Sequence, residues 1–278
     1  MAGTLGRPTV GATMRVPIYH VDAFTDRRFR GNPAAVMLLS RFLDDAILQA
    51  VAAENNLAET AFLVREGSAW RLRWFTPKVE VPFCGHATLA SAWVVTHRID
   101  PTRDRVAFDT ASGILTVTRG GDGRFLMDFP ARDVTSVASP PASLAAALGV
   151  RPLDVLHDGY NYVAVLDGAT MVRRLTPDLR AVAALDGAVG VIVTAEGDDG
   201  YDCVSRYFAP AKGIDEDPVT GGAHCALTPL WSKRLGKKEL RAYQASARGG
   251  EIVCRAAGER VELEGACTFY MEGEAEVA

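Results

Sequence analysis

Two stretches decide the fold of this chain: RWFTPKVEVPFCGHA at residues 73–87 and RYFAPAKGIDEDPVTGGA at residues 206–223. Both run from an arginine through an aromatic residue, Phe, a small residue and Pro to a Pro-x-x-Gly-x-Ala segment that opens an apolar run. The copies lie much further apart than the ~20–50 residues of a solenoid repeat. The pattern therefore predicts two similar halves, each presenting the start of a helix, with one ligand site between them.

The composition is that of an ordinary globular protein. Its 278 residues suffice for one large or two small domains with a full hydrophobic core. A net charge of −4 offers no basic surface for nucleic acid, and no apolar run reaches the ~18 residues that a membrane span needs. The five cysteines form no C-x-x-C pair and we expect no secretory leader, so the sequence favours a cytoplasmic protein without nucleic-acid or membrane partners.

Hydrophobic periodicity predicts an α+β fold. Strands are expected at residues 17–24, 34–39, 60–64, 70–75, 106–110, 114–119, 124–129, 162–165, 189–194, 203–208, 251–255, 260–263 and 267–272. Helices are expected at residues 44–55, 84–97, 141–148, 176–184 and 223–235, with Pro177 in the first turn of the fourth. Many strands with one central apolar helix per half indicate two pseudo-symmetric domains, each a curved sheet or barrel around a helix.

Polar residues and prolines cluster at residues 130–141, which predicts a domain boundary there. We expect an N-terminal domain at residues 14–130 and a C-terminal domain at residues 131–264. Residues 1–13 are rich in Gly, Thr and Pro and are expected to be a disordered lead-in.

The first candidate for chemistry is Glu59, which follows the helix at 44–55 and enters an apolar strand. A partly buried carboxylate can take up and release a proton near neutral pH, as a general acid/base must. A surface acid or a partner of the helix end is the structural alternative. The matching stretch of the second half, AVGVIV at residues 188–193, carries no acid, and this asymmetry favours function.

The second candidate is the helix start at Cys84, Gly85 and His86. The N–H groups of Gly85 and His86 can bind a carboxylate or an enolate oxygen, and a helix N-terminus lowers the pKa of a thiol such as Cys84. The alternatives are a small, buried Cys84 and a capping His86. We favour burial for Cys84 and a role in binding substrate for His86.

The second half offers Asp217, Gly221 and Gly222. Asp217 either caps the following helix or helps to hold a substrate, and the sequence leaves both open. The glycine pair allows the backbone to approach a ligand closely.

Other chemistries lack their motifs. His224 and Cys225, taken with Cys84 and His86, match no zinc-site spacing and lie in an apolar helix, so we expect no metal. The sequence contains no G-x-G-x-x-G, Walker A or G-x-S-x-G motif, which disfavours nucleotide, phosphoryl-transfer and serine-hydrolase chemistry.

Five segments together resemble the PhzF-like phenazine-biosynthesis isomerase family: GNPAAV at 31–36, NLAETAF at 56–62, RWFTP at 73–77, PFCGHATL at 82–89 and EDPVTGGAHC at 216–225. They occur in the order of the family and span nearly the whole chain after Met14. The resemblance implies a diaminopimelate-epimerase-like fold of two α/β domains, with the site in the cleft between them. It also implies a homodimer and C-terminal strands, at about residues 265–278, that return to the first domain.

The resemblance implies an isomerase that acts on a small carboxylate-bearing metabolite without metal or organic cofactor. The best-characterised member isomerises trans-2,3-dihydro-3-hydroxyanthranilate. By motif match, the family's proton-shuttling glutamate falls on Glu59 and its histidine and aspartate fall on His86 and Asp217. Backbone contacts to substrate fall on Gly85 and Gly221.

Two departures from the family pattern keep other hypotheses open. Gly222 stands where the phenazine enzyme has a serine, so a binding protein with a vestigial catalytic set is one alternative. Cys84 stands where that enzyme has a small apolar residue, so an epimerase or racemase that uses Cys84 with Glu59 is another. The two-thiol version is disfavoured because the position that matches the second thiol is Thr220.

Overall fold

Strand pairing follows the same order twice in this computed structural model, which describes residues 14–67 and 69–277. The predicted lead-in at 1–13 lies outside the described residues. The first half pairs its strands in the order β18, β1, β2, β3, β4, β6, β7, β8. The second half pairs its strands in the order β9, β10, β11, β12, β13, β15, β16, β17.

The direction of each pairing is also repeated. The pairs β2–β3 and β4–β6 are parallel, as are β11–β12 and β13–β15, and the remaining pairs in these two orders are antiparallel. The short strands β5 and β14 each fold back on the strand before them, β4 and β13. The predicted pseudo-symmetric α+β fold is therefore confirmed.

The strands have these bounds. The first half contains β1 (Met14–Ala23), β2 (Asn32–Leu39), β3 (Glu59–Glu66), β4 (Ala69–Phe75), β5 (Glu80–Val81), β6 (Arg105–Thr110), β7 (Gly113–Arg119), β8 (Phe125–Pro130) and β18 (Cys267–Val277). The second contains β9 (Thr135–Ser136), β10 (Asp154–His157), β11 (Tyr162–Val165), β12 (Val191–Glu196), β13 (Cys203–Ala209), β14 (Ile214–Asp217), β15 (Glu239–Gln244), β16 (Gly250–Ala257) and β17 (Arg260–Gly265).

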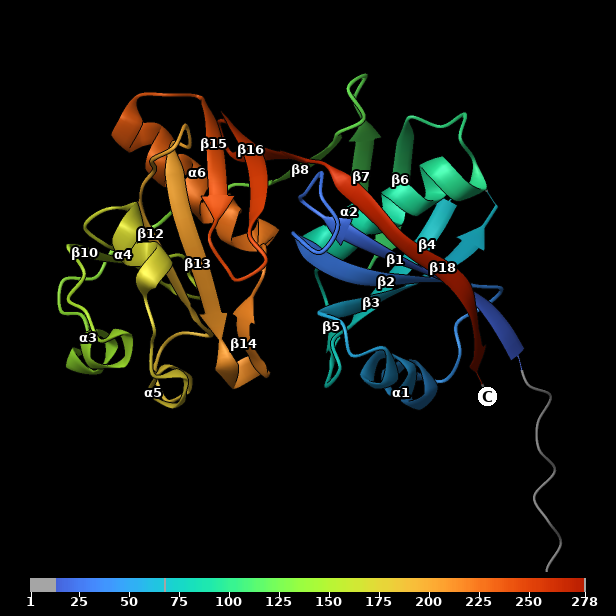
Figure 1. Ribbon diagram of the computed structural model, residues 1–278, viewed down its shortest axis with the longest axis horizontal. Helices are drawn as coiled ribbons and strands as arrows, with labels where there is room; N and C mark the ends of the chain where they lie inside the picture. Colours follow the sequence, from blue (N-terminus) through green and yellow to red (C-terminus); the bar gives the residue numbers. More distant parts are fainter. Residues whose placement is uncertain (1–13, 68, 278) are drawn as a thin grey trace, which may run out of the picture.

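One helix lies within the strands of each half, α2 (Gly85–Val94) in the first and α6 (Gly221–Leu235) in the second (Figure 1). Every residue of α2 is buried, as expected for a helix that is apolar or small on all sides. The chain leaves α2 through a π-helical turn at Val95–Ile99. The shorter outer helices are α1 (Asp45–Asn55), α3 (Ala142–Leu148), α4 (Ala169–Arg174) and α5 (Leu179–Ala183).

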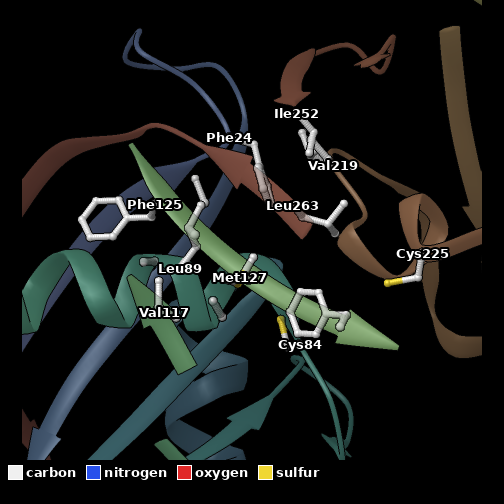
Figure 2. Close-up of a cluster of buried hydrophobic side chains, with 14 of the residues drawn as sticks. Phe24, Cys84, Leu89, Val117, Phe125, Met127, Val219, Cys225, Ile252 and Leu263 are labelled. Atoms are coloured by element: carbon white, nitrogen blue, oxygen red, sulfur yellow. The ribbon is translucent and has the colours of Figure 1, made fainter. Parts of the chain in front are cut away.

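The two halves are joined by strands and by a shared core. Strand β8 pairs with β17 of the second half, and β18 then crosses back to run beside β1 (Figure 1). A single buried apolar cluster contains residues from α2, from α6 and from strands of both halves. Figure 2 shows it running from Cys84, Leu89 and Met127 through Leu263 to Val219 and Cys225. Moving one half against the other would therefore disturb a common core.

The structure corrects the limits of some predicted helices. The helix predicted at 84–97 begins at Gly85, with Cys84 as its N-cap. The helix predicted at 176–184 begins at Leu179, because the Asp178 side chain accepts hydrogen bonds from the N–H groups that open the first turn. Pro177 therefore precedes the helix. The elements α4, β5, β9, β10, β14 and β15 were not predicted from the sequence, and the domain limits at 130 and 131 stay a prediction.

Candidate active site

The two central helices begin against each other. A Cβ atom placed on Gly85 would lie 3.8 Å from the Cα of Gly221, which is an ordinary van der Waals contact and shows that the two helix starts adjoin. Within the described chain, neither N-cap side chain, of Cys84 or of Thr220, bonds to the N–H groups of its own helix. Two helix N-termini, each with a partial positive charge, therefore open at one place, which suits an anionic group.

Glu59 and His86 face each other beside these helix starts. Both are buried, with 7% and 4% of their surface exposed. Glu59 Oε2 and His86 Nε2 lie 3.1 Å apart, but the pair does not have hydrogen-bond geometry, and neither atom has a hydrogen-bond partner among the described residues. Buried polar atoms in a native fold are nearly always paired. The acid and the base thus form a close ion pair without a well-aligned hydrogen bond, which leaves both atoms available to a third group.

Asn32 connects the two halves at this point. It opens β2, and its Nδ2 lies 2.8 Å from Asp217 Oδ1, 2.9 Å from the carbonyl of Val219 and 3.1 Å from His86 Nδ1. It is fully buried, and its Oδ1 is a further atom without a partner in the described part of the chain. Asn32 belongs to the GNPAAV motif, but its local sequence predicted no role for it.

Asp217 ends β14 and is not the N-cap of α6, because Thr220 occupies that position. Its Oδ1 accepts from Asn32 and its Oδ2 accepts from the hydroxyl of Thr220 at 2.5 Å. Burial and then the charge of Glu59 raise the pKa of Asp217 to about 6, against the opposing effects of His86, Thr220 and Asn32. The capping alternative is thus wrong, and Asp217 joins the cluster around Glu59.

Gln244 fixes the position of Thr220. The backbone N–H of Thr220 donates to Gln244 Oε1 at 2.8 Å, while Gln244 Nε2 donates to the carbonyl of Asp217 at 2.8 Å and lies 3.0 Å from the Thr220 hydroxyl. Gln244 is fully buried. It lies in a strand that the sequence analysis missed, so this supporting residue was missed as well.

The Cys84 thiol is not activated in the way that the sequence suggested. It is buried and lies 3.5 Å from His86 Nδ1. Burial and then the charge of Glu59 raise the pKa of Cys84, outweighing the lowering effect of His86. The expected lowering at the helix start is therefore wrong, because desolvation of a thiolate exceeds the benefit from the helix dipole. The predicted burial of Cys84 is confirmed.

His86 is held in a charged environment. Burial opposes protonation of its ring, but Cys84 and Glu59 outweigh that effect and raise the pKa of His86 well above its ordinary value. His224 behaves in the opposite way, since burial lowers its pKa to about 4 and its Nδ1 lies 2.8 Å from the carbonyl of Thr220. The core role expected for His224 and Cys225 is confirmed by their burial within α6.

The same cluster contains residue types that bind metal ions. Glu59, Cys84 and His86 each offer one donor atom, and these atoms lie within 4.8 Å of one another. However, Cys84 faces Nδ1 of the imidazole and Glu59 faces Nε2. One ion cannot be bound by all three in this arrangement, because the two ring nitrogens point in different directions. The geometry therefore does not fit a metal centre.

A separate cavity of about 430 Å³ lies where Phe24 and the turn at Gly249 meet. Its described lining includes several arginines and none of the candidate catalytic residues. The buried ionisable groups therefore converge away from this cavity.

Residues 21–273 match the family model described as phenazine biosynthesis-like protein. The chain belongs to the PhzC-PhzF family. It is 50% identical over 260 residues to an uncharacterized isomerase of Pseudomonas aeruginosa. The aligned region covers 94% of this chain and 98% of that protein. It is 39% identical to a human phenazine biosynthesis-like domain-containing protein, with 94% and 99% of the two chains covered.

Solved structures agree with the fold. A PhzF family protein of Enterococcus faecalis superposes with a TM-score of 0.90 at 44% identity, covering 94% of this chain and 99% of that chain. A hydroxyproline epimerase of Agrobacterium vitis, at 13% identity, shares only the fold, with a TM-score of 0.60 over 94% and 92% of the chains.

These relatives confirm the predicted family and fold class and, at the level of the family, an isomerase. The substrate, the roles of individual residues, the homodimer and the cytoplasmic location stay predictions. In the described part of the chain, no helix is both long and apolar enough to cross a membrane.

Proposed function

We propose that the protein is a cofactor-independent isomerase that moves a proton within a small carboxylate-bearing metabolite, with Glu59 as the general acid/base. The observation that carries this proposal is the buried Glu59 Oε2, which lies 3.1 Å from His86 Nε2 and has no hydrogen-bond partner among the described residues. This observation supports the proposal because a general base needs an oxygen that can accept a proton from the substrate. The isomerase names of the curated relatives point the same way.

The proposed reaction begins when ionised Glu59 takes a proton from a carbon next to an unsaturated system. The electron pair of the broken C–H bond delocalises into that system and places negative charge on an oxygen. The N–H groups at the starts of α2 and α6, at Gly85 and Gly221, can stabilise this charge. Glu59 then returns the proton to a different carbon. Proton and electrons balance without an oxidant or another reactant.

His86 and Asp217 have supporting roles in this proposal. The charge of Glu59 favours the protonated form of His86, so the ring can offset that charge and donate to the substrate. Asp217, with a pKa of about 6, is protonated in part at neutral pH and can donate or accept. Cys84 fits the epimerase alternative poorly, because its raised pKa keeps it as the neutral thiol.

Proton exchange with heavy water tests the proposal. The wild type is incubated in heavy water with a metabolite extract supplemented with trans-2,3-dihydro-3-hydroxyanthranilate, and mass spectrometry identifies carboxylates that gain deuterium. Glu59→Gln keeps the size of the side chain and is expected to reduce labelling by at least ~100-fold. Glu66→Gln, an exposed glutamate at the other end of β3, is the matched control and is expected to label normally.

Two results contradict the proposal. If Glu59→Gln, shown to be folded by circular dichroism, labels as fast as the wild type, Glu59 is not the shuttle. If the wild type binds a metabolite from the extract but labels none, the binding-protein alternative replaces the enzyme.

A further inference from the structure

Arg132 lies next to the site in the segment that connects the two halves. It falls between β8 and β9, and its backbone N–H donates to the carbonyl of Cys225 on α6 at 3.0 Å. This bond anchors the segment to the first turns of α6. From the sequence alone, this segment was expected to be only a domain boundary.

The Arg132 guanidinium is held in place but donates no hydrogen bond to any described residue. It lies over the ring of Tyr160, with 4.9 Å to the ring centroid, and its Nη1 is 3.7 Å from Asp158 Oδ2. About a third of its side chain, 32%, is exposed. Stacking and one ion pair therefore orient the group while its N–H donors stay available.

The Asp158 carboxylate does not need Arg132 as a hydrogen-bond donor, so its charge alone does not explain the position of the guanidinium. Asp158 Oδ1 accepts from the backbone N–H groups of Tyr160 and Asn161 at 2.9 and 2.5 Å, and Oδ2 accepts from Asn161 Nδ2 at 3.1 Å. Both carboxylate oxygens are thus bound within their own loop. Asp158 therefore orients the Arg132 guanidinium, while its own hydrogen bonds come from other residues.

Arg132 is directed toward the start of α6. A Cβ atom placed on Gly222 would lie 4.0 Å from Arg132 Nη1. Because Gly222 has no side chain, nothing of that residue separates the guanidinium from the helix start. Gly222 follows Gly221, which adjoins Gly85 of α2, and Gly85 precedes His86, which faces Glu59.

Tyr207 links this region to Asp217. Its hydroxyl donates to Asn161 Oδ1 at 3.0 Å. Burial raises the pKa of Tyr207, followed by the charges of Asp217 and Asp158, and the charge of Arg132 opposes them. The charges of both Asp217 and Arg132 therefore affect the pKa of Tyr207.

We propose that Arg132 is the specificity-determining residue that binds the carboxylate of the substrate, together with the N–H groups at the start of α6. This assignment rests on the proposed function and narrows its substrate to a metabolite with an anionic carboxylate on the α6 side of the site. A guanidinium and a carboxylate match in geometry, since two parallel N–H groups meet two oxygens.

Binding of a stable probe pair tests the assignment without turnover. Anthranilate carries a planar ring carboxylate, and anthranilamide replaces that carboxylate by a neutral amide. Calorimetry of the wild type is expected to show tighter binding of anthranilate. Arg132→Gln is expected to weaken anthranilate binding about 10- to 100-fold, the loss of a charge-assisted pair, with anthranilamide binding unchanged. Arg132→Lys keeps the charge but not the planar pair of N–H donors, and its affinity for anthranilate is expected to lie between those of the wild type and Arg132→Gln.

Arg180→Gln removes one exposed positive charge on α5 and serves as the control, with anthranilate binding as in the wild type. The assignment is wrong if Arg132→Gln binds anthranilate as the wild type does, or if the wild type fails to bind it at millimolar concentrations. Glu59→Gln separates the two proposals. If it keeps anthranilate binding and loses labelling, both stand; if it keeps labelling while Arg132→Gln loses binding, only the assignment of Arg132 survives.

Discussion

The two helix starts share a backbone and differ in their side chains. Cys84 and Thr220 are both extended N-caps, with φ and ψ of −150° and 109° for Cys84 and −116° and 98° for Thr220. In the first half the N-cap sulfur faces His86, whereas in the second the N-cap hydroxyl donates to Asp217. The repeated backbone supplies two helix ends that suit an anion, and we expect the chemistry to come from the side chains that are not repeated.

The strand that carries Glu59 shows the same contrast. Glu59 opens β3 and is buried, while the residue just before the corresponding strand β12 is Gly190. A Cβ atom on Gly190 would come within 2.5 Å of the carbonyl of Phe208. The second half therefore has no room for a side chain at this position, and the acid belongs to one half for steric reasons.

Removing the residue that bridges the halves should have the largest effect on stability. Asn32→Ala deletes the donor to the Asp217 carboxylate and to the Val219 carbonyl in a fully buried position. We expect the free energy of unfolding in urea to fall by about 3 kcal/mol. We also expect the folded variant to exchange protons more slowly, because Asp217 loses its partner.

Asn55→Ala is the control for that change, since Asn55 bonds to Thr60 from the outer helix α1. It should lower stability by less and leave proton exchange intact. Equal exchange in Asn32→Ala and the wild type, at a temperature where both are folded, would show that Asn32 is purely structural.

Asp217→Asn should change how stability depends on pH. The pKa of Asp217 is raised from 3.8 to about 6 by folding, so its contribution to stability is complete below about pH 4 and is lost as the pH rises through about 6. The variant has no titrating carboxyl group at this position, so its stability does not fall in this way as the pH rises. Relative to the wild type it should gain about 2 kcal/mol between about pH 4.5 and about pH 7.5, measured by urea unfolding.

Part of that shift comes from the charge of Glu59. The gain should therefore be smaller when the same comparison is made in the Glu59→Gln background. A difference in stability that does not vary with pH would contradict the raised pKa.

Cys84→Thr copies the N-cap of the second half into the first and should have the smallest effect. Threonine is similar in size, and the cost of placing a hydroxyl in the buried N-cap position is about 1 kcal/mol. Because the thiol is neutral, deuterium labelling should stay within a few-fold of the wild type. A loss as large as that of Glu59→Gln would instead support the Cys84 epimerase.

Local sequence patterns predicted most of the strands and both central helices. The run after Gly85 is small and apolar on all sides, and the helix that it forms is buried at every residue. The patterns failed for α4, which is short, and for β15, whose Glu239, Arg241 and Tyr243 alternate with buried residues in a charged stretch. Asn32 and Arg132 were not assigned a role because each gains its partners from distant segments.

The sequence by itself determined that two similar halves each begin a central helix with glycine, because helix periodicity and the Pro-x-x-Gly-x-Ala pattern are local properties of the chain. Only the tertiary structure decided that Glu59, His86 and Asp217 meet through Asn32, which is 185 residues from Asp217. It also decided the direction of the Cys84 pKa, since the helix start favours a thiolate but burial removes its solvation. Contacts between distant residues and the loss of water depend on packing, which no local pattern encodes.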